Sequence, residues 1–221
     1  MLRDVTFFLG LLLFISCSGN KQNAEEPVAI EPKIISPKIN SRMDTIRTEN
    51  FWELINKSVL NSNNVDSTKA HFLVSELAKL SPGEIINFEI ALRKLIIDAD
   101  DYKIMAAAKI INGYVSDDSY LYFRCWLIGQ GQKTYTETLK NPDYLAGIVN
   151  KGDMCDFEEL LYVATNSFSL KTGKKEDETF PRNIAEGLGL DYDFGAPKTK
   201  GTDWKEEQLP ELYPKLWTKI N

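Results

Sequence analysis

Apolar residues recur every three or four positions through most of this chain from about residue 48 onward. This spacing places them on one face of an α-helix, whereas a half-buried strand would alternate apolar and polar positions. No alternating run of convincing length is present in the sequence. The pattern predicts three early helices, with apolar positions at Phe51, Leu54, Ile55 and Val59; at Phe72, Leu73, Leu77 and Leu80; and at Ile85, Phe88, Leu92, Leu95 and Ile96.

Residues that start and stop helices divide this pattern into separate elements. Ser81-Pro82-Gly83-Glu84 combines a capping serine, a proline in the first turn and a glutamate three residues after the cap. Asn112-Gly113 is typical of a helix end, and Ser116 is typical of the start of the next helix. Further helices are predicted at about Asp153 to Leu170 and at about Lys205 to Ile220, the second being interrupted by prolines.

These elements predict an all-α fold. We expect one compact domain over residues 45–221, built from about six to eight helices. A long irregular loop is expected near the C-terminus, where the chain contains Gly187, Gly189, Gly195 and Gly201.

The first sixteen residues have a different character. An apolar run from Val5 to Ile15 leads into Phe14-Ile15-Ser16-Cys17. The run is too short to span a bilayer, but it suits the apolar region of a signal peptide. A small residue directly before a cysteine resembles the bacterial lipobox, which implies a signal peptide over residues 1–16 and lipidation of Cys17. An ordinary signal peptide and a short uncleaved anchor are the alternatives.

Residues 17–44 are predicted to form a disordered tether that begins with the lipidated Cys17. This segment is polar, lacks apolar periodicity and contains Pro27, Pro32 and Pro37 at equal intervals. Segments of this kind remain extended and act as semi-rigid spacers. The chain is therefore expected in the bacterial cell envelope, on the outer membrane or the periplasmic face rather than in the cytoplasm, and held to the membrane by lipid.

The net charge limits the classes of partner that this chain is expected to bind. The net charge of −6 and the absence of a basic face argue against binding to nucleic acid. An acidic chain instead favours a basic partner, such as another envelope protein or a secreted protein.

Cys125 and Cys155 both fall in apolar helical patterns and are expected to be buried thiols, with a disulfide between them as the alternative.

The stretch from Asn112 to Gly131 places Arg124 among apolar residues that point in nearly every direction. A buried guanidinium needs a carboxylate partner, because an uncompensated buried charge is strongly destabilising. Asp117 lies two helical turns earlier, about 10 Å away. Glu158 or Glu159, in the other strongly apolar segment, is the better expected partner, and this pairing is interpreted as structural.

Asn112, Asp117 and Asp118 form a candidate ligand junction between two helices. Their oxygen atoms could hold a divalent cation or a cationic group. Aspartates at this position also act as ordinary helix-capping residues, and their spacing matches no calcium-binding loop. The sequence contains no phosphate-binding loop, nucleophile elbow, zinc-protease motif or Cys-x-x-Cys pair, so no catalytic residue, metal or cofactor is assigned.

Several segments together resemble the bacterial domain-of-unknown-function family 4240 over roughly residues 48–216. The resemblance implies an α-helical fold and implies no reaction. The segments that carry it are Phe51-Trp52-Glu53-Leu54-Ile55, Leu80-Ser81-Pro82-Gly83-Glu84-Ile85, Ile111-Asn112-Gly113, Ser116-Asp117-Asp118, Tyr122-Phe123-Arg124, Trp126-Leu127-Ile128, Asn141-Pro142-Asp143, Glu158-Glu159-Leu160-Leu161-Tyr162 and Asp203-Trp204.

These observations favour a membrane-tethered lipoprotein that acts as a protein- or ligand-binding module. A groove is expected near Trp204 and the glycine-rich connection, with Trp217 as a second candidate lining residue. Two alternatives remain open at this stage. One is a hydrolase-type enzyme with a carboxylate site at Asp117 and Asp118, and the other is a purely structural envelope component.

Overall fold

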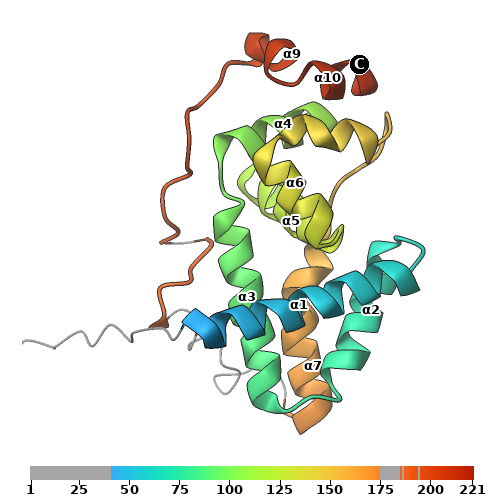
Figure 1. Ribbon diagram of the computed structural model, residues 1–221, viewed down its shortest axis with the longest axis vertical. Coiled ribbons are helices and arrows are strands. Elements are labelled where there is room, and N and C mark those ends of the chain that lie inside the picture. Colours follow the sequence, from blue (N-terminus) through green and yellow to red (C-terminus); the bar gives the residue numbers. More distant parts are fainter. Residues whose placement is uncertain (1–40, 175–184, 186, 194) are drawn as a thin grey trace, which may run out of the picture. The chain divides into compact units, whose positions relative to one another are not determined.

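Helices make up most of the part of the chain that the structure describes (Figure 1). The computed structural model describes residues 41–174, 185, 187–193 and 195–221, with side chains from residue 48 onward. No strand occurs among these residues, and the one β-type contact reported there is an isolated parallel bridge between Asp101 and Lys200. The predicted all-α fold is thus confirmed. Its elements are α1 (Ser41–Asn61), α2 (Asp66–Leu77), α3 (Pro82–Asp98), α4 (Tyr102–Asn112), α5 (Asp117–Gly129), α6 (Gln132–Lys140), η1 (Pro142–Gly147), η2 (Glu158–Tyr162), α7 (Val163–Thr172), η3 (Glu206–Gln208), α9 (Leu209–Leu212) and α10 (Pro214–Ile220).

The predicted signal peptide over residues 1–16 and the predicted lipidation site Cys17 lie outside the described residues. Most of the predicted tether lies outside them as well. Helix α1 begins at Ser41, a few residues before the expected end of the tether at Asp44. Among the helices that the structure describes, none is long and apolar enough to cross a membrane.

Helix boundaries in the first half of the domain follow the capping residues. The Ser81 side chain accepts a hydrogen bond from the Glu84 amide at 3.3 Å, and the Glu84 carboxylate accepts one from the Ser81 amide at 2.8 Å. This reciprocal pair satisfies amides that have no partner within α3. Helix α4 ends at Gly113 in the left-handed conformation, with φ of 77°. Ser116 caps the start of α5, as predicted, through reciprocal hydrogen bonds with Ser119.

The segment expected as one helix from Asp153 to Leu170 is built differently. Residues 153–157 have no regular secondary structure, η2 is a 3₁₀-helix, and α-helical geometry begins only at Val163. The Phe157 ring is fully buried and packs closely on Gly129 of α5. The Phe157 amide also donates to the Tyr122 carbonyl at 3.2 Å. These contacts with α5 fix residues 153–157 as a packed connection rather than as the first turns of a helix.

Tertiary packing joins the helices into one core. Helix α1 contacts α2 and α3, and α7 contacts the same two helices (Figure 1). Helix α5 contacts α1, α2, α3, α4 and α6. At the C-terminus, α10 packs on α4 and η1. Asp143 in η1 anchors it there, because the Asp143 carboxylate accepts the amides of Leu216 at 2.7 Å and Lys215 at 3.3 Å. Five of the large buried side chains are Phe51, Phe88, Phe123, Leu127 and Phe157.

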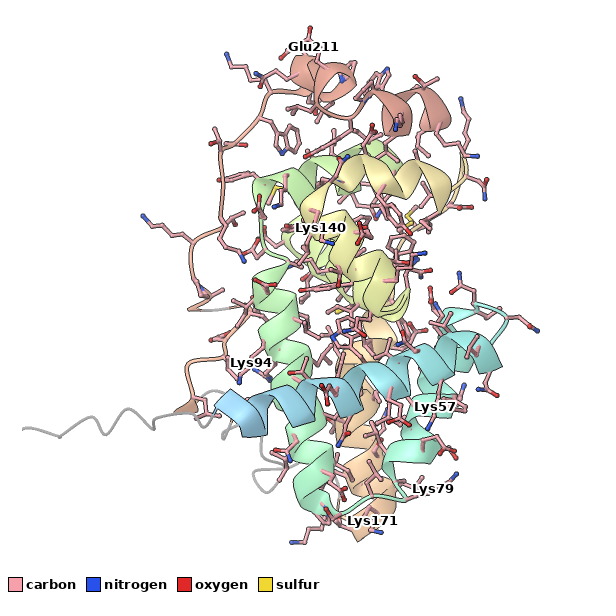
Figure 2. The ribbon with its side chains drawn as sticks, viewed as in Figure 1. Lys57, Lys79, Lys94, Lys140, Lys171 and Glu211 are labelled. Carbon is pink, nitrogen blue, oxygen red and sulfur yellow. The ribbon has the colours of Figure 1, made fainter. Side chains whose placement is uncertain are left out.

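Charged residues behave differently inside and outside this core. Lys69 in α2 is fully buried and pairs with Asp66 at 2.9 Å. The exposed lysines Lys57, Lys79 and Lys140 extend from the helical surfaces (Figure 2) and pair with glutamates three or four residues earlier on the chain. Such exposed pairs contribute little to stability, whereas a buried charge depends on its partner.

Candidate functional site

The predicted ligand junction is organised around a structural clamp. The Asn112 side chain donates to the Cys155 carbonyl at 3.1 Å and accepts from the Cys155 amide at 3.0 Å. The amide therefore uses its oxygen and its nitrogen to hold residues 153–157 against the end of α4. These two hydrogen bonds fix the orientation of the Asn112 side chain toward the Cys155 backbone.

Asp117 and Asp118 lie exposed in the first turn of α5. Their negative charge there favours the helix, because the amino end of a helix carries partial positive charge. Burial, together with the negative charges of Glu158 and Asp118, raises the pKa of Tyr122 to about 12. Within the described ranges, no group of three or more histidine, cysteine, aspartate or glutamate side chains is placed to hold a metal ion.

Arg124 has a different partner from the one expected. Its guanidinium donates to the Ile96 carbonyl at 3.2 Å and lies 3.8 Å from the Asp100 carboxylate. It also lies over the ring of Tyr120, with the guanidinium carbon 4.6 Å from the ring centroid. Arg124 is 6% exposed, and its Nε has no hydrogen-bond partner among the described atoms.

The expected pairing of Arg124 with Glu158 or Glu159 is therefore corrected. Glu158 accepts a hydrogen bond from the Tyr162 hydroxyl at 2.7 Å, and Glu159 is exposed. Both glutamates occupy the first turn of η2 rather than the middle of a long helix. The link between α3 and α4 supplies the carboxylate instead, because α3 packs against α5 and carries Asp100 to the arginine.

The two described cysteines are buried free thiols, in agreement with the expectation. Burial raises the pKa of both Cys125 and Cys155 well above the ordinary range of a thiol. A thiol held in this neutral form is a poor nucleophile, because the thiolate is the reactive species. Both cysteines are accordingly interpreted as core residues.

A pocket with a volume of about 500 Å³ lies beside the amino end of α4. Three parts of the chain line it: the start of α4, the segment over residues 195–204 that we call the C-terminal strap, and the residues from η3 to Tyr213. The lining residues are Asp101, Lys103, Ala106, Gly201, Thr202, Asp203, Trp204, Gln208, Leu212 and Tyr213.

Backbone hydrogen bonds fix the C-terminal strap against the α3–α4 link. The Tyr102 amide donates to the Lys200 carbonyl at 2.9 Å, and the Lys200 amide donates to the Asp100 carbonyl at 3.1 Å. Gly201 follows with φ of 83°, and a Cβ placed there would lie 2.7 Å from a carboxylate oxygen of Asp101. Only glycine combines this conformation with so close an approach.

Asp101 is held from two sides. Its carboxylate accepts the Lys103 amide at 3.0 Å and thereby caps α4. Its backbone is held by the Tyr120 hydroxyl, which accepts from the Asp101 amide at 3.0 Å and lies 2.9 Å from the Asp101 carbonyl. The Asp101 carboxylate is thus presented at a fixed position on the pocket wall.

Aromatic residues form much of the remaining wall. The Trp204 indole nitrogen donates to the Tyr102 carbonyl at 2.8 Å, which fixes the half-buried ring. Tyr213 is buried, and burial together with the negative charges of Asp101 and Asp143 raises its pKa to about 12. Its phenol is therefore neutral at physiological pH. Trp204, expected to border a groove, lines this pocket, whereas Trp217 is not among its lining residues.

Carboxylates outnumber ammonium groups among the residues that line the pocket. Asp101 and Asp203 contribute two carboxylates, and Lys103 contributes one ammonium, 3.6 Å from the Asp101 carboxylate. Asp101, Lys103 and Tyr213 were not singled out from sequence. Asp101 precedes a helix and was readable as a cap, but its proximity to the strap depends on contacts between residues about a hundred positions apart.

The family comparison covers the helical body of this chain. The family model described as "Protein of unknown function (DUF4240)" matches residues 46–169. The comparisons with curated proteins and with solved structures yield no match. The matched region includes the junction at Asn112 and one side of the pocket, and it ends before the C-terminal strap. Because the match covers more than half of the 221 residues, the chain belongs to the DUF4240 family, as the sequence motifs indicated.

Proposed function

We propose that this chain is a lipid-anchored binding module of the bacterial cell envelope. In this proposal, the pocket beside α4 holds a basic side chain from another envelope protein or from a secreted protein. The observation that carries the proposal is the pocket itself, which combines fixed aromatic rings with an excess of carboxylates. Ammonium and guanidinium groups bind favourably to both chemical features.

The pocket also has the dimensions of a ligand site. Small-molecule sites usually enclose about 300–1,000 Å³, and this pocket, with about 500 Å³, has room for a basic side chain and part of its flanking peptide. Its walls are fixed before a ligand arrives, because Asp101 and Trp204 each hydrogen bond to backbone groups. Preorganised walls lower the entropy lost on binding. The net charge of −6 would further favour the approach of a basic partner.

A peptide titration tests the pocket. The probes are two capped pentapeptides, one with a central arginine and one with a central glutamate, both flanked by alanines. We expect calorimetry to show binding of the arginine peptide only. Asp203→Lys should abolish it, whereas Glu211→Lys, an equal charge change on α9 at the position labelled in Figure 2, should leave it intact. Equal effects of the two variants, or equal binding of the two peptides, would overturn the proposed pocket.

The anchor is tested separately. The proposal of lipidation rests on the sequence Phe14-Ile15-Ser16-Cys17. We expect Cys17→Ala to move the protein from the membrane fraction to the soluble fraction and to remove the acyl mass from the intact protein. Unchanged fractionation and mass would contradict lipidation without affecting the argument for the pocket.

A further inference from the structure

Lys103 already brings a positive charge into the pocket beside α4. It belongs to the first turn of α4 and lines the pocket together with Asp101. The Lys103 ammonium lies 3.6 Å from Oδ2 of Asp101, and the Lys103 side chain is 42% exposed. A basic ligand that enters the pocket therefore meets a cation that belongs to the protein itself.

Both oxygens of the Asp101 carboxylate are engaged before a ligand arrives. Oδ1 accepts the Lys103 amide at 3.0 Å in the hydrogen bond that caps α4, and Oδ2 faces the Lys103 ammonium. At the other carboxylate of the pocket, Oδ1 of Asp203 accepts the Trp204 amide at 2.7 Å. An incoming cation thus reaches Asp101 by displacing the Lys103 ammonium from Oδ2 or by sharing that oxygen with it.

The contact between Lys103 and Asp101 is weak enough to be exchanged. At 3.6 Å it is longer than a hydrogen bond, and ion pairs between partly exposed side chains contribute little to stability. The lysine side chain is flexible, so its ammonium can turn toward solvent while its amide continues to cap α4. Asp101 stays in place during this exchange, because the Tyr120 hydroxyl holds its backbone.

This exchange distinguishes the two basic side chains that a partner can offer. A lysine replaces one ammonium by another at Asp101, so the contact yields no net gain. An arginine brings a planar guanidinium with five N–H donors, which forms paired hydrogen bonds to carboxylates and stacks on aromatic rings. Trp204 and Tyr213 supply such rings in the wall of the pocket. The exchange therefore favours arginine.

We propose that Lys103 is a built-in competitor for the ligand of this pocket, and that the pocket selects guanidinium over ammonium groups. This inference rests on the proposed function, because a competitor requires a ligand. Lys103 holds the affinity for every basic ligand below the value that Asp101 and Asp203 would otherwise give. Only a ligand that bonds to Asp101 better than an ammonium does then binds well.

The test uses the full chain and two capped pentapeptides, with a central arginine or a central lysine flanked by alanines. In calorimetry, we expect the wild-type chain to bind the arginine peptide more tightly by about tenfold or more. Lys103→Met removes the charge and keeps most of the aliphatic chain, so it should tighten binding of both peptides by about threefold or more. Lys103→Arg keeps the charge and competes better for Asp101, so it should weaken binding of the arginine peptide by about threefold or more.

Two controls separate competition at Asp101 from a general effect of charge. Lys205→Met removes one positive charge at an exposed position next to Trp204 and should change the affinity by less than about twofold. In an Asp101→Asn background, where asparagine can still cap α4, Lys103→Met should lose its effect.

The outcomes distinguish the competitor from the pocket. Binding of the arginine peptide that does not respond to the two Lys103 substitutions, or that responds equally to Lys103→Met and Lys205→Met, would overturn the competitor and leave the proposed function standing. Equal wild-type affinity for the two peptides would overturn the selection of guanidinium. Binding to the Lys103→Met variant alone would support the competitor and show that Lys103 closes the wild-type pocket. Binding to none of these proteins would overturn the proposed function and the competitor together.

Discussion

Asn112 and Cys155 are 43 positions apart in the chain, and the side chain of the first makes two hydrogen bonds to the backbone of the second, at 3.1 and 3.0 Å. The pair joins the end of α4 to the connection that leads into η2. We expect Asn112→Ala to lower the free energy of unfolding by about 2 kcal/mol, because two half-buried backbone groups lose their partner. Denaturant titration measures this. Asp118→Asn should change stability by less than about 1 kcal/mol; a larger loss there than in Asn112→Ala would contradict the clamp.

The buried ion pair in α3 gives a second prediction. Glu89 and Arg93 lie 2.7 Å apart, with side chains that are 3% and 5% exposed. Removing one partner leaves an uncompensated buried charge, so Glu89→Ala should cost about 3–5 kcal/mol of unfolding free energy. The exposed pair of Glu53 and Lys57 is the control, and Glu53→Gln should leave the denaturation midpoint nearly unchanged. Similar losses in the two variants would rule out burial as the cause.

The contact between Gly129 and Phe157 predicts sensitivity to one added methyl group. A Cβ at Gly129 would lie 2.6 Å from the Phe157 ring, which is fully buried. Gly129→Ala should therefore destabilise the protein by about 1–3 kcal/mol through overpacking. Gly147→Ala, where a Cβ meets nothing within 4 Å, should show no such loss in thermal unfolding. A neutral Gly129→Ala would mean that residues 153–157 can move away from α5.

The reciprocal cap at the start of α3 predicts a pH dependence. Hydrogen bonds from the Ser81 side chain and backbone hold the pKa of Glu84 below its ordinary value of 4.5. A carboxyl whose folded pKa is lowered contributes stability that is present above its unfolded pKa and is lost as pH falls through the folded value. Stability measured downward from neutral pH should therefore decline below about 4.5, and Ser81→Ala should flatten part of that decline. An identical pH profile in the variant would disprove the link.

Gly201 predicts how firmly the C-terminal strap is held. Because of its positive φ and its approach to Asp101, Gly201→Ala should loosen the strap without unfolding the helical body. The expected result is faster hydrogen exchange at the amides of Tyr102 and Lys200, which form the bridge. Exchange at amides in the middle of α5 should be unchanged. Unaltered exchange at the bridge would show that the strap is held by its other contacts.

Local signals in the sequence predicted local structure well. Ser81 with Glu84, Gly113 and Ser116 mark helix boundaries that the structure reproduces, because capping depends on residues within one turn of each other. Helix α6 was not predicted, because its sequence from Gln132 to Lys140 is mostly polar and short, and only Tyr135 and Leu139 mark its apolar face.

Contacts between residues that are far apart in the chain were less predictable from the sequence. Arg124 clearly needed a carboxylate, but the sequence could not show that Asp100 would be nearer than Glu158, because this depends on how α3 and η2 pack against α5. The pocket was unpredictable for the same reason, because its walls come together only through tertiary packing. Trp204 was recognisable as a candidate lining residue, whereas its neighbour Asp101 became one only through the bridge to Lys200. Tertiary contacts of this kind leave no local pattern.

The bridge between Asp101 and Lys200 joins two parts of the chain that each form one wall of the pocket. One side, with Asp101, Lys103 and Ala106, lies inside the region that matches the family, and the other side, from Gly201 to Tyr213, lies beyond it. Under the binding role proposed above, substitutions at the exposed residues Thr202, Asp203 and Gln208 would alter one wall of the pocket without disturbing the buried core. The recognition properties of the pocket could thus be changed independently of the packing that stabilises the fold.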